Sequence, residues 1–291
     1  MLIKTFQLQI EKIKSNKTTF FLLLILSAVI IWFGNKHDAG HGHSNVIQAI
    51  GYLFAMWLCA YCIDLYAVMR PLKRDFVVRR PLLESVIAFI SPVLGGVCIL
   101  MRFSGQIPWE QRPGIAKLPI FLGLILFLYP IALAIIMLLL KYKLKDLGFR
   151  VQGFIPGIVV LIITALTAYI VAPGRFTIHE VLQEGGGIIG ALVMGFIYAA
   201  LPEEFLRLIL QTRFGALLRN TGAGWLIASL IWGLLHGPKW YGETKDFIET
   251  ILSCLRIVPL GLMWGYLTHR TKSILPSILA HGMNVWGLQS F

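Results

Sequence analysis

The sequence predicts an all-α, polytopic integral membrane protein with about nine transmembrane helices. Of its 291 residues, 57% are hydrophobic and only 14% are charged, and the mean hydropathy is +0.76. A soluble domain is about 45–50% apolar and about 25% charged. The apolar residues form long continuous runs, which excludes the alternating strands of an outer-membrane barrel. The basic residues are also sorted along the chain as in a membrane protein.

Each apolar run is about as long as one helix across the hydrocarbon core, which takes about 20 residues. The runs lie at about 19–34, 46–69, 82–101, 118–140, 154–172, 187–212, 223–240, 249–268 and 274–290. Four lysines precede the first run, as in a signal peptide, but no small-residue cleavage site follows it. We therefore interpret the first run as an uncleaved span.

The Lys and Arg residues indicate which loops face the cytoplasm. If the N-terminus is cytoplasmic, eighteen of the 26 basic residues fall in cytoplasmic segments and seven in the opposite ones. This is the positive-inside pattern, so we expect the N-terminus inside and the C-terminus outside. The topology then accounts for the formal net charge of +12, and no nucleic-acid partner is required.

Residues that are costly in lipid gather in the last four predicted spans. An ionisable side chain inside a membrane costs several kcal/mol unless it is paired or hydrated, so it is a functional candidate. The candidates are Glu203, Glu204, Arg207, His236, Arg256, His281 and Asn284. At a helix rise of about 1.5 Å per residue, the glutamates and histidines lie about 13–20 Å deep. We therefore expect them to share one polar cavity.

Such a set of side chains suits the hydrolysis of an amide. A carboxylate beside a histidine can act as a general base on water, and a carboxylate paired with Arg at i,i+4 stays ionised. Histidine and asparagine can donate hydrogen bonds to an oxyanion or hold a metal such as zinc. Taken singly, each residue also has a structural explanation, as a helix-end ion pair, a packing histidine or interhelical glue.

Three segments carry these residues in a recognisable order: PEEFLRLILQTRF, SLIWGLLHG and PLGLMWGYLTHRTKSILPSILAHGMN. Together they resemble the CAAX-protease and bacteriocin-processing (CPBP, or ABI) family of intramembrane proteases. That family has Glu-Glu-x-x-x-Arg on one helix, Phe-x-x-x-His on the next and His-x-x-x-Asn on the last. The resemblance covers about residues 185–290. It implies two parts, 1–184 with about five helices of unassigned role, and 185–291 as a protease core of about four spans.

The resemblance also implies roles for the candidate residues. One glutamate of the Glu203–Glu204 pair would activate water, and Arg207 would orient a carboxylate. His236 and His281 would support the water and the oxyanion, with Asn284 beside His281. If the chemistry uses a metal, His236 and His281 are the candidate ligands of a zinc ion.

Two spacings differ from the family pattern and leave the roles of the two glutamates open. Arg207 follows Glu203 by four residues instead of five, and Asn284 follows His281 by three instead of four. Helix geometry favours Glu203 as the partner of Arg207 and Glu204 as the base. The family register anchored on Arg207 instead makes Glu203 essential. Pro202 could break the helix and reset this register.

The function that we expect is an endopeptidase of a membrane-associated protein or peptide, embedded in the lipid bilayer of a bacterial cytoplasmic membrane. One alternative is a catalytically inactive CPBP-like scaffold or bacteriocin self-immunity protein. A second is a transporter, although the first half of the chain shows no matching repeat. His37, His41 and His43, in the first outside loop, could bind a metal or simply form a polar loop.

Overall fold

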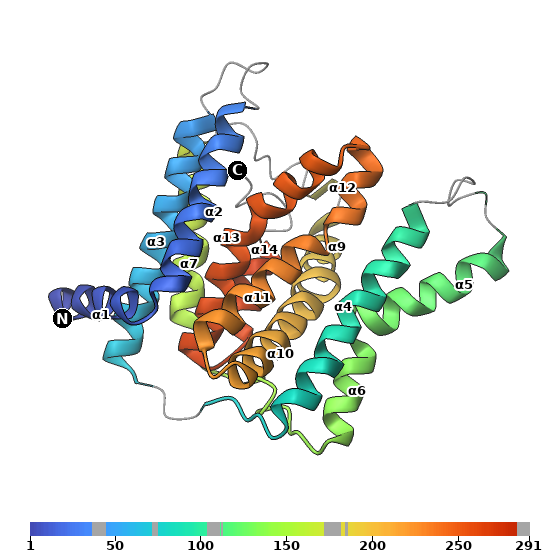
Figure 1. Cartoon of the computed structure of the whole chain (residues 1–291), viewed down its shortest axis with the longest axis horizontal. Helices are drawn as coiled ribbons and strands as arrows, with labels where there is room; N and C mark the ends of the chain where they lie inside the picture. Colours follow the sequence, from blue (N-terminus) through green and yellow to red (C-terminus); the bar gives the residue numbers. More distant parts are fainter. Residues whose placement is uncertain are drawn as a thin grey trace. The chain divides into compact units, whose positions relative to one another are not determined.

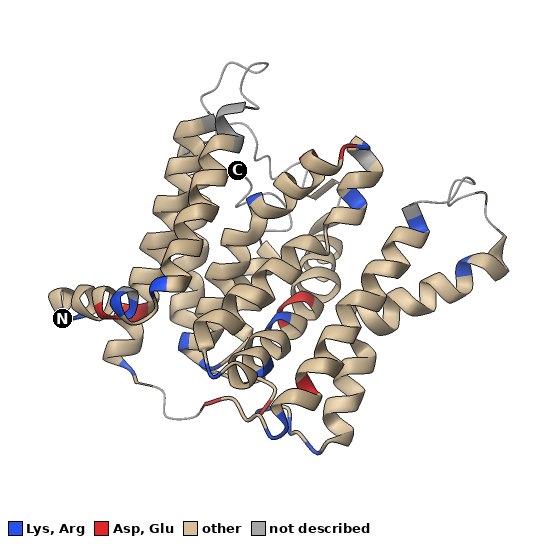
Figure 2. Ribbon diagram, in the orientation of Figure 1, with Lys and Arg blue, Asp and Glu red and all other residues tan. Residues whose placement is uncertain are grey.

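The protein is all-helical in a computed structural model, which confirms the predicted fold class. The structure describes residues 1–36, 45–71, 75–103, 111, 113–171, 182–183 and 186–283. Every regular element in this part of the chain is a helix (Figure 1). Most of each long helix lacks charged residues, and many Lys and Arg residues lie near helix ends and in connections (Figure 2). This distribution fits an integral membrane protein.

Four helices of the described residues are long and apolar enough to cross a membrane. They comprise Val46–Met69, Pro81–Arg102, Gly187–Leu217 and Phe247–Thr271. Two bent pairs raise the number to six if each pair forms one span: Leu2–Lys12 with Lys17–Trp32 at 96°, and Gly114–Leu128 with Ile131–Leu139 at 52°. The nine spans and the orientation of the termini are not confirmed and stay predictions.

Two of the predicted apolar runs are not one continuous helix. The run 118–140 bends between η3 (Leu124–Leu128) and α6 (Ile131–Leu139), around Pro130. The run 223–240 is divided between α11 (Thr221–Leu234) and α12 (Gly237–Thr244). Mean hydropathy measures only how apolar a run is, so it does not detect a bend or a break within the run.

The described chain forms two compact units. The first comprises Met1–Phe76, Gly148–Glu204 and Leu262–Phe291, and the second comprises Val77–Leu147 and Phe205–Gly261. Two helices, α10 (Leu201–Leu217) and α13 (Phe247–Thr271), contribute residues to both units. The predicted division of roles between 1–184 and 185–291 stays a prediction.

In the first unit, α3 (Asn45–Met69) packs against α2 (Lys17–Lys36) and α7 (Phe154–Val171), as Figure 1 shows. The helix α14 (Leu275–Met283) packs against α7 and against the π-helix η4 (Val193–Ala200). Gly157 of α7 allows this approach, because an added Cβ there would lie 2.9–3.1 Å from atoms of Pro276. The close packing of α14 against the α7 backbone at this glycine therefore sets the position of α14.

The buried carboxylate of Asp64 connects three helices of the first unit. It lies 2.8 Å from Nζ of Lys12 on α1 (Leu2–Ser15), and accepts a 2.6 Å hydrogen bond from the Tyr266 hydroxyl on α13. Nε of Arg270, also on α13, forms an ion pair with Asp64 at 2.8 Å. These charge-assisted contacts fasten α1 to α3 and α13.

In the second unit, α4 (Pro81–Phe103) packs against α5 (Gly114–Gly123), η3, α6 and α12. A glycine again marks a close helix crossing. A Cβ added to Gly233 of α11 would lie 2.8 Å from Cγ2 of Val258 and 2.9 Å from the carbonyl oxygen of Cys254 on α13. Glycine thus lets α11 and α13 pack closely, as small residues do between membrane helices.

Candidate active site

The two glutamates lie in the first turn of α10, directly after a change in helix type. The π-helix η4 ends at Ala200 and α10 begins at Leu201. Proline has no backbone N–H, so Pro202 cannot donate an ordinary helical hydrogen bond at this junction. A π-helical turn holds more residues than an α-helical one, and so changes which side chains share a face. The register thus changes beside Pro202, where the sequence allowed for a break.

His281 of α14 lies between the two carboxylates. Its Nδ1 is 2.8 Å from Oε1 of Glu204, and its Nε2 is 3.5 Å from Oε2 of Glu203. The side chains of His281 and Glu204 are 5% and 1% exposed, whereas that of Glu203 is 29% exposed. These three residues, all in the first unit, lie next to one another, and the expected convergence with His236 stays a prediction.

The two glutamates differ in burial. Glu204, which helix geometry favoured as the base, is buried, and its Oε1 lies 2.8 Å from Nδ1 of His281. Glu203 is the carboxylate that solvent reaches. The reason is the rotation of α10: neighbouring helical residues project about 100° apart, so only one of the pair can point directly into the core.

The hydrogen bond to Glu204 also fixes the tautomer of His281. An ionised carboxylate can only accept hydrogen bonds, so Nδ1 of His281 must carry a proton. In the neutral imidazole, Nε2 then carries a lone pair on the side of Glu203. The 3.5 Å separation between Nε2 of His281 and Oε2 of Glu203 is long for a direct hydrogen bond.

Neighbouring helices hold the imidazole ring in place. Trp264 of α13 stacks on His281, with ring centroids 3.9 Å apart and planes 14° apart. Ser277, one turn before His281, donates a 2.8 Å hydrogen bond to the carbonyl oxygen of Trp264. On another side, a Cβ added to Gly282 would lie 2.6–3.0 Å from the ring of Phe196 in η4. The histidine is therefore positioned by α10, α13 and η4 together.

Arg207 lies in the second unit with its charge buried. Its side chain is 1% exposed, and its guanidinium carbon lies 5.3 Å from the ring centroid of Trp232. Gly261 makes room for both residues, because an added Cβ would lie 2.7 Å from Trp232 and 3.5 Å from Arg207. A cation over an indole face is a favourable arrangement. The expected pairing of Arg207 with Glu203 stays a prediction.

His236, also in the second unit, lies between two tryptophans. Its ring centroid is 5.0 Å from that of Trp232 and 5.6 Å from that of Trp240. Its Nδ1 is 3.0 Å from the carbonyl oxygen of Trp232, which can only accept a hydrogen bond. Nδ1 therefore carries the proton, and Nε2 of the neutral ring is left to accept a hydrogen bond or bind a cation.

Several expected residues lie outside the described part of the chain. They are Asn284 and the loop histidines His37, His41 and His43. Within the described residues, no group of three or more His, Cys, Asp or Glu side chains is arranged to hold a metal ion. The expectation of a zinc ligand pair at His236 and His281 stays a prediction.

Sequence reasoning missed the residues that position His281. Trp264 and Phe196 lie in apolar runs, where an aromatic residue ordinarily indicates packing. A signal for Trp264 was present, because it lies within the third motif segment, on α13, with Thr268 one turn further on. The Thr268 and Ser277 hydroxyls are 2.7 Å apart and link α13 to α14.

Comparison of the sequence with known proteins relates part of the chain to a family. No curated protein and no solved structure matches the chain. One family model, described as type II CAAX prenyl endopeptidase Rce1-like, matches residues 185–287, about a third of the chain. The match includes Glu203, Glu204, Arg207, His236, His281 and Asn284. It confirms the resemblance seen in the motifs: residues 185–287 are similar to the type II CAAX prenyl endopeptidase Rce1-like family.

Proposed function

We propose that this protein is an intramembrane endopeptidase that hydrolyses a peptide bond in a membrane-associated protein or peptide. One observation carries the proposal: within the family segment, the His281 imidazole is held between a buried carboxylate and a partly exposed one. A hydrolytic site can be built from a carboxylate that acts as a base, an imidazole beside it, and a second carboxylate that orients the imidazole. The bilayer of a bacterial cytoplasmic membrane is the proposed location.

In the proposed mechanism, Glu203 is the general base and Glu204 is a positioning residue. Glu204 accepts the Nδ1 proton of His281 in a hydrogen bond and so turns Nε2 toward Glu203. A water molecule beside both groups donates one hydrogen bond to Nε2 and the other to the Glu203 carboxylate. Its oxygen lone pair is then aimed at the carbonyl carbon of the substrate.

Proton transfer from this water to Glu203 accompanies formation of the new carbon–oxygen bond. The carbonyl oxygen becomes an oxyanion, which needs hydrogen-bond donors. On the strength of the motifs, His236 and Asn284 are the proposed oxyanion partners, and Arg207 is proposed to hold a carboxylate of the site. Collapse of the intermediate breaks the carbon–nitrogen bond, and the proton on Glu203 moves to the leaving amine. No step passes through a metal ion.

Two glutamine variants test this assignment. Glu203→Gln should abolish cleavage while the protein accumulates normally, because this partly exposed side chain loses only its basicity. The loss of a general base corresponds to about 10²–10⁴ in rate. Glu204→Gln should lower both cleavage and abundance, because it removes a buried charge-assisted hydrogen bond. Glu11→Gln, a change at an exposed carboxylate of α1, is the matched control.

The measurement is proteomics of membrane-protein termini in cells that express each variant, together with the steady-state level of the protein. Termini made by the wild type and by Glu11→Gln should disappear with Glu203→Gln. An active Glu203→Gln protein would overturn the proposal. If only Glu204→Gln is inactive at normal abundance, the roles of the two glutamates are reversed. Neither a transporter nor an inactive scaffold is favoured by the family match.

A further inference from the structure

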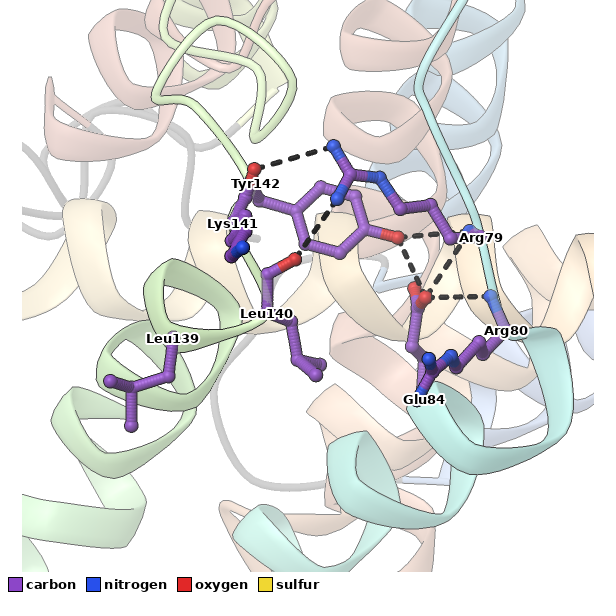
Figure 3. Close-up of a pocket in the computed structure, with 7 residues that line it drawn as sticks. All are labelled: Arg79, Arg80, Glu84, Leu139, Leu140, Lys141 and Tyr142. Carbon is purple, nitrogen blue, oxygen red and sulfur yellow. Dashed lines mark hydrogen bonds between the residues drawn. The ribbon is translucent and has the colours of Figure 1, made fainter.

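A basic cavity lies in the second unit, where α4 begins and α6 has just ended. Its volume is about 320 Å³. The residues that line it are Arg79, Arg80, Glu84, Leu139, Leu140, Lys141 and Tyr142. Figure 3 shows the two arginines reaching in from the α4 side and residues 139–142 forming the opposite wall. None of these residues belongs to the family segment or to the proposed active site.

The acidic residue of the cavity is already neutralised. Oε1 of Glu84 accepts hydrogen bonds from the backbone N–H groups of Arg79 and Arg80 at 3.2 and 2.8 Å, and from the Tyr142 hydroxyl at 2.6 Å. Oε2 accepts a 3.1 Å hydrogen bond from Nε of Arg213, which is fully buried. The negative charge of Glu84 is thus matched by Arg213, and it cannot also offset the cations of the lining.

The basic side chains of the lining are not offset by a second carboxylate among the described residues. The Arg79 guanidinium donates to the carbonyl oxygens of Leu140 and Lys141 at 3.0 and 3.3 Å and lies 4.8 Å from the Tyr142 ring centroid. These partners are neutral. Among the described residues, no acidic side chain forms an ion pair with Arg79, Arg80 or Lys141. Three positive charges around one cavity repel one another unless an anion lies between them.

The cavity also lies at the level where lipid headgroups are expected. Pro81 begins α4, whose residues Pro81–Arg102 are a candidate membrane span. Next to the cavity, large apolar side chains are exposed: Leu82 by 66%, Leu83 by 43% and Leu139 by 76%. Acyl chains could lie against these leucines while a headgroup occupies the cavity. Basic pockets at the ends of membrane helices are typical sites for anionic headgroups.

We propose that this cavity binds the phosphate group of an anionic phospholipid, held by Arg80 and Lys141. Arg79 shapes the wall and adds its charge. A phosphate group matches cations of this kind in charge and in hydrogen-bond acceptors. By the positive-inside prediction, the lipid belongs to the cytoplasmic leaflet. The site does not depend on the proposed peptidase activity.

The test compares two double variants of equal charge change. Arg80→Gln with Lys141→Gln alters the cavity, whereas Lys143→Gln with Lys145→Gln alters two exposed lysines just outside the lining. Retention of phosphatidylglycerol by the purified chain is measured by native mass spectrometry, with phosphatidylcholine as the reference lipid. The cavity variant should lose retention by roughly thirtyfold, the effect of two cations at an anionic headgroup, and the control should not.

A second measurement guards against misfolding. Phosphatidylglycerol should raise the unfolding temperature of the wild type and of the control, since a ligand of the folded state stabilises it. The cavity variant should unfold at the wild-type temperature without lipid and show no such rise. Equal losses in both double variants, or no loss in either, would overturn the proposal. Displacement of the lipid by inorganic phosphate alone would identify a soluble-anion site instead and would equally overturn it.

Discussion

The imidazole of His281 lies flat against the indole of Trp264, with ring centroids 3.9 Å apart and planes inclined by 14°. Because Trp264 is fully buried, this contact is shielded from water. An indole face attracts positive charge. The stack therefore fixes the plane of the imidazole and favours it whenever it carries a proton.

Replacing Trp264 should weaken catalysis more than substrate binding. Trp264→Leu removes the stack, so kcat should fall by about tenfold, the loss expected for about 1–2 kcal/mol of cation–π stabilisation. KM should change little. Trp264→Phe keeps an aromatic face and should recover part of the activity. Steady-state kinetics on a reconstituted substrate measure both values, and equal kcat for the Leu variant and the wild type would contradict this prediction.

Gly282 should not tolerate a methyl group unless Phe196 is made smaller. A Cβ at Gly282 would lie 2.6–3.0 Å from the Phe196 ring, and overpacking of this kind costs about 1–3 kcal/mol. Gly282→Ala should therefore lower stability and displace His281, with loss of activity. The double variant with Phe196→Leu should recover both. Gly114→Ala, where an added Cβ meets nothing within 4 Å, is the control; no rescue by Phe196→Leu would count against the packing explanation.

The buried ion pair between Glu84 and Arg213 should show strong coupling. Nε of Arg213 lies 3.1 Å from Oε2 of Glu84, and both side chains are at most 1% exposed. Glu84→Gln or Arg213→Met alone strands a buried charge, which costs about 3–5 kcal/mol. Because the amide oxygen that Glu84→Gln introduces can still accept the backbone hydrogen bonds, the double variant should be much closer to the wild type. Unfolding free energies of the wild type, the two single variants and the double variant, measured in mixed micelles, give a double-mutant cycle. If the two single losses of stability simply add up in the double variant, the residues are not coupled.

The Tyr142 hydroxyl should ionise only at unusually high pH. Burial, together with the hydrogen bond to Glu84, raises the pKa of Tyr142 above the ordinary value of about 10. A raised pKa means that the stabilisation is complete below pH about 10 and is lost as the pH rises through the higher value. The tyrosinate absorbance of the wild type minus that of Tyr142→Phe should report this titration. Tyr241→Phe, at a more exposed tyrosine, provides the comparison.

The topology is open to a direct test with fused reporters. The distribution of Lys and Arg residues predicts that a reporter after Phe291 lies outside the cytoplasm and one within residues 70–80 lies inside. A reporter enzyme that is active only outside the cytoplasm distinguishes the two sites. A cytoplasmic C-terminus would show that an odd number of spans is wrong.

Three of the side chains selected from the sequence lie together in the structure, but their contacts could not be predicted. Glu203, Glu204 and His281 could be selected because each is costly in lipid unless it finds a polar partner. Which carboxylate binds His281 depends on the rotation of α10. That rotation follows from the π-helix before Pro202, and counting residues in an α-helical register cannot supply it.

The sequence also could not predict which residues far apart in the chain form ion pairs. Arg213 counted as one of the basic residues at a cytoplasmic turn, yet it is fully buried and pairs with Glu84, 129 positions earlier in the chain. A count of charges along the sequence treats each residue by itself. Only the packing of α10 beside the start of α4, within the second unit, shows that Arg213 and Glu84 neutralise each other.

The hydrogen bond between Glu204 and His281 joins residues 77 positions apart in the chain. A ribosome adds about 5–20 residues per second, so Glu204 is made about 4–15 s before His281. Throughout that interval the carboxylates have no imidazole to orient, and in the proposed mechanism the growing chain cannot cleave anything. Its earlier helices therefore enter the bilayer beside other newly made proteins while it is still inert, and hydrolytic capacity arises only when α14 docks.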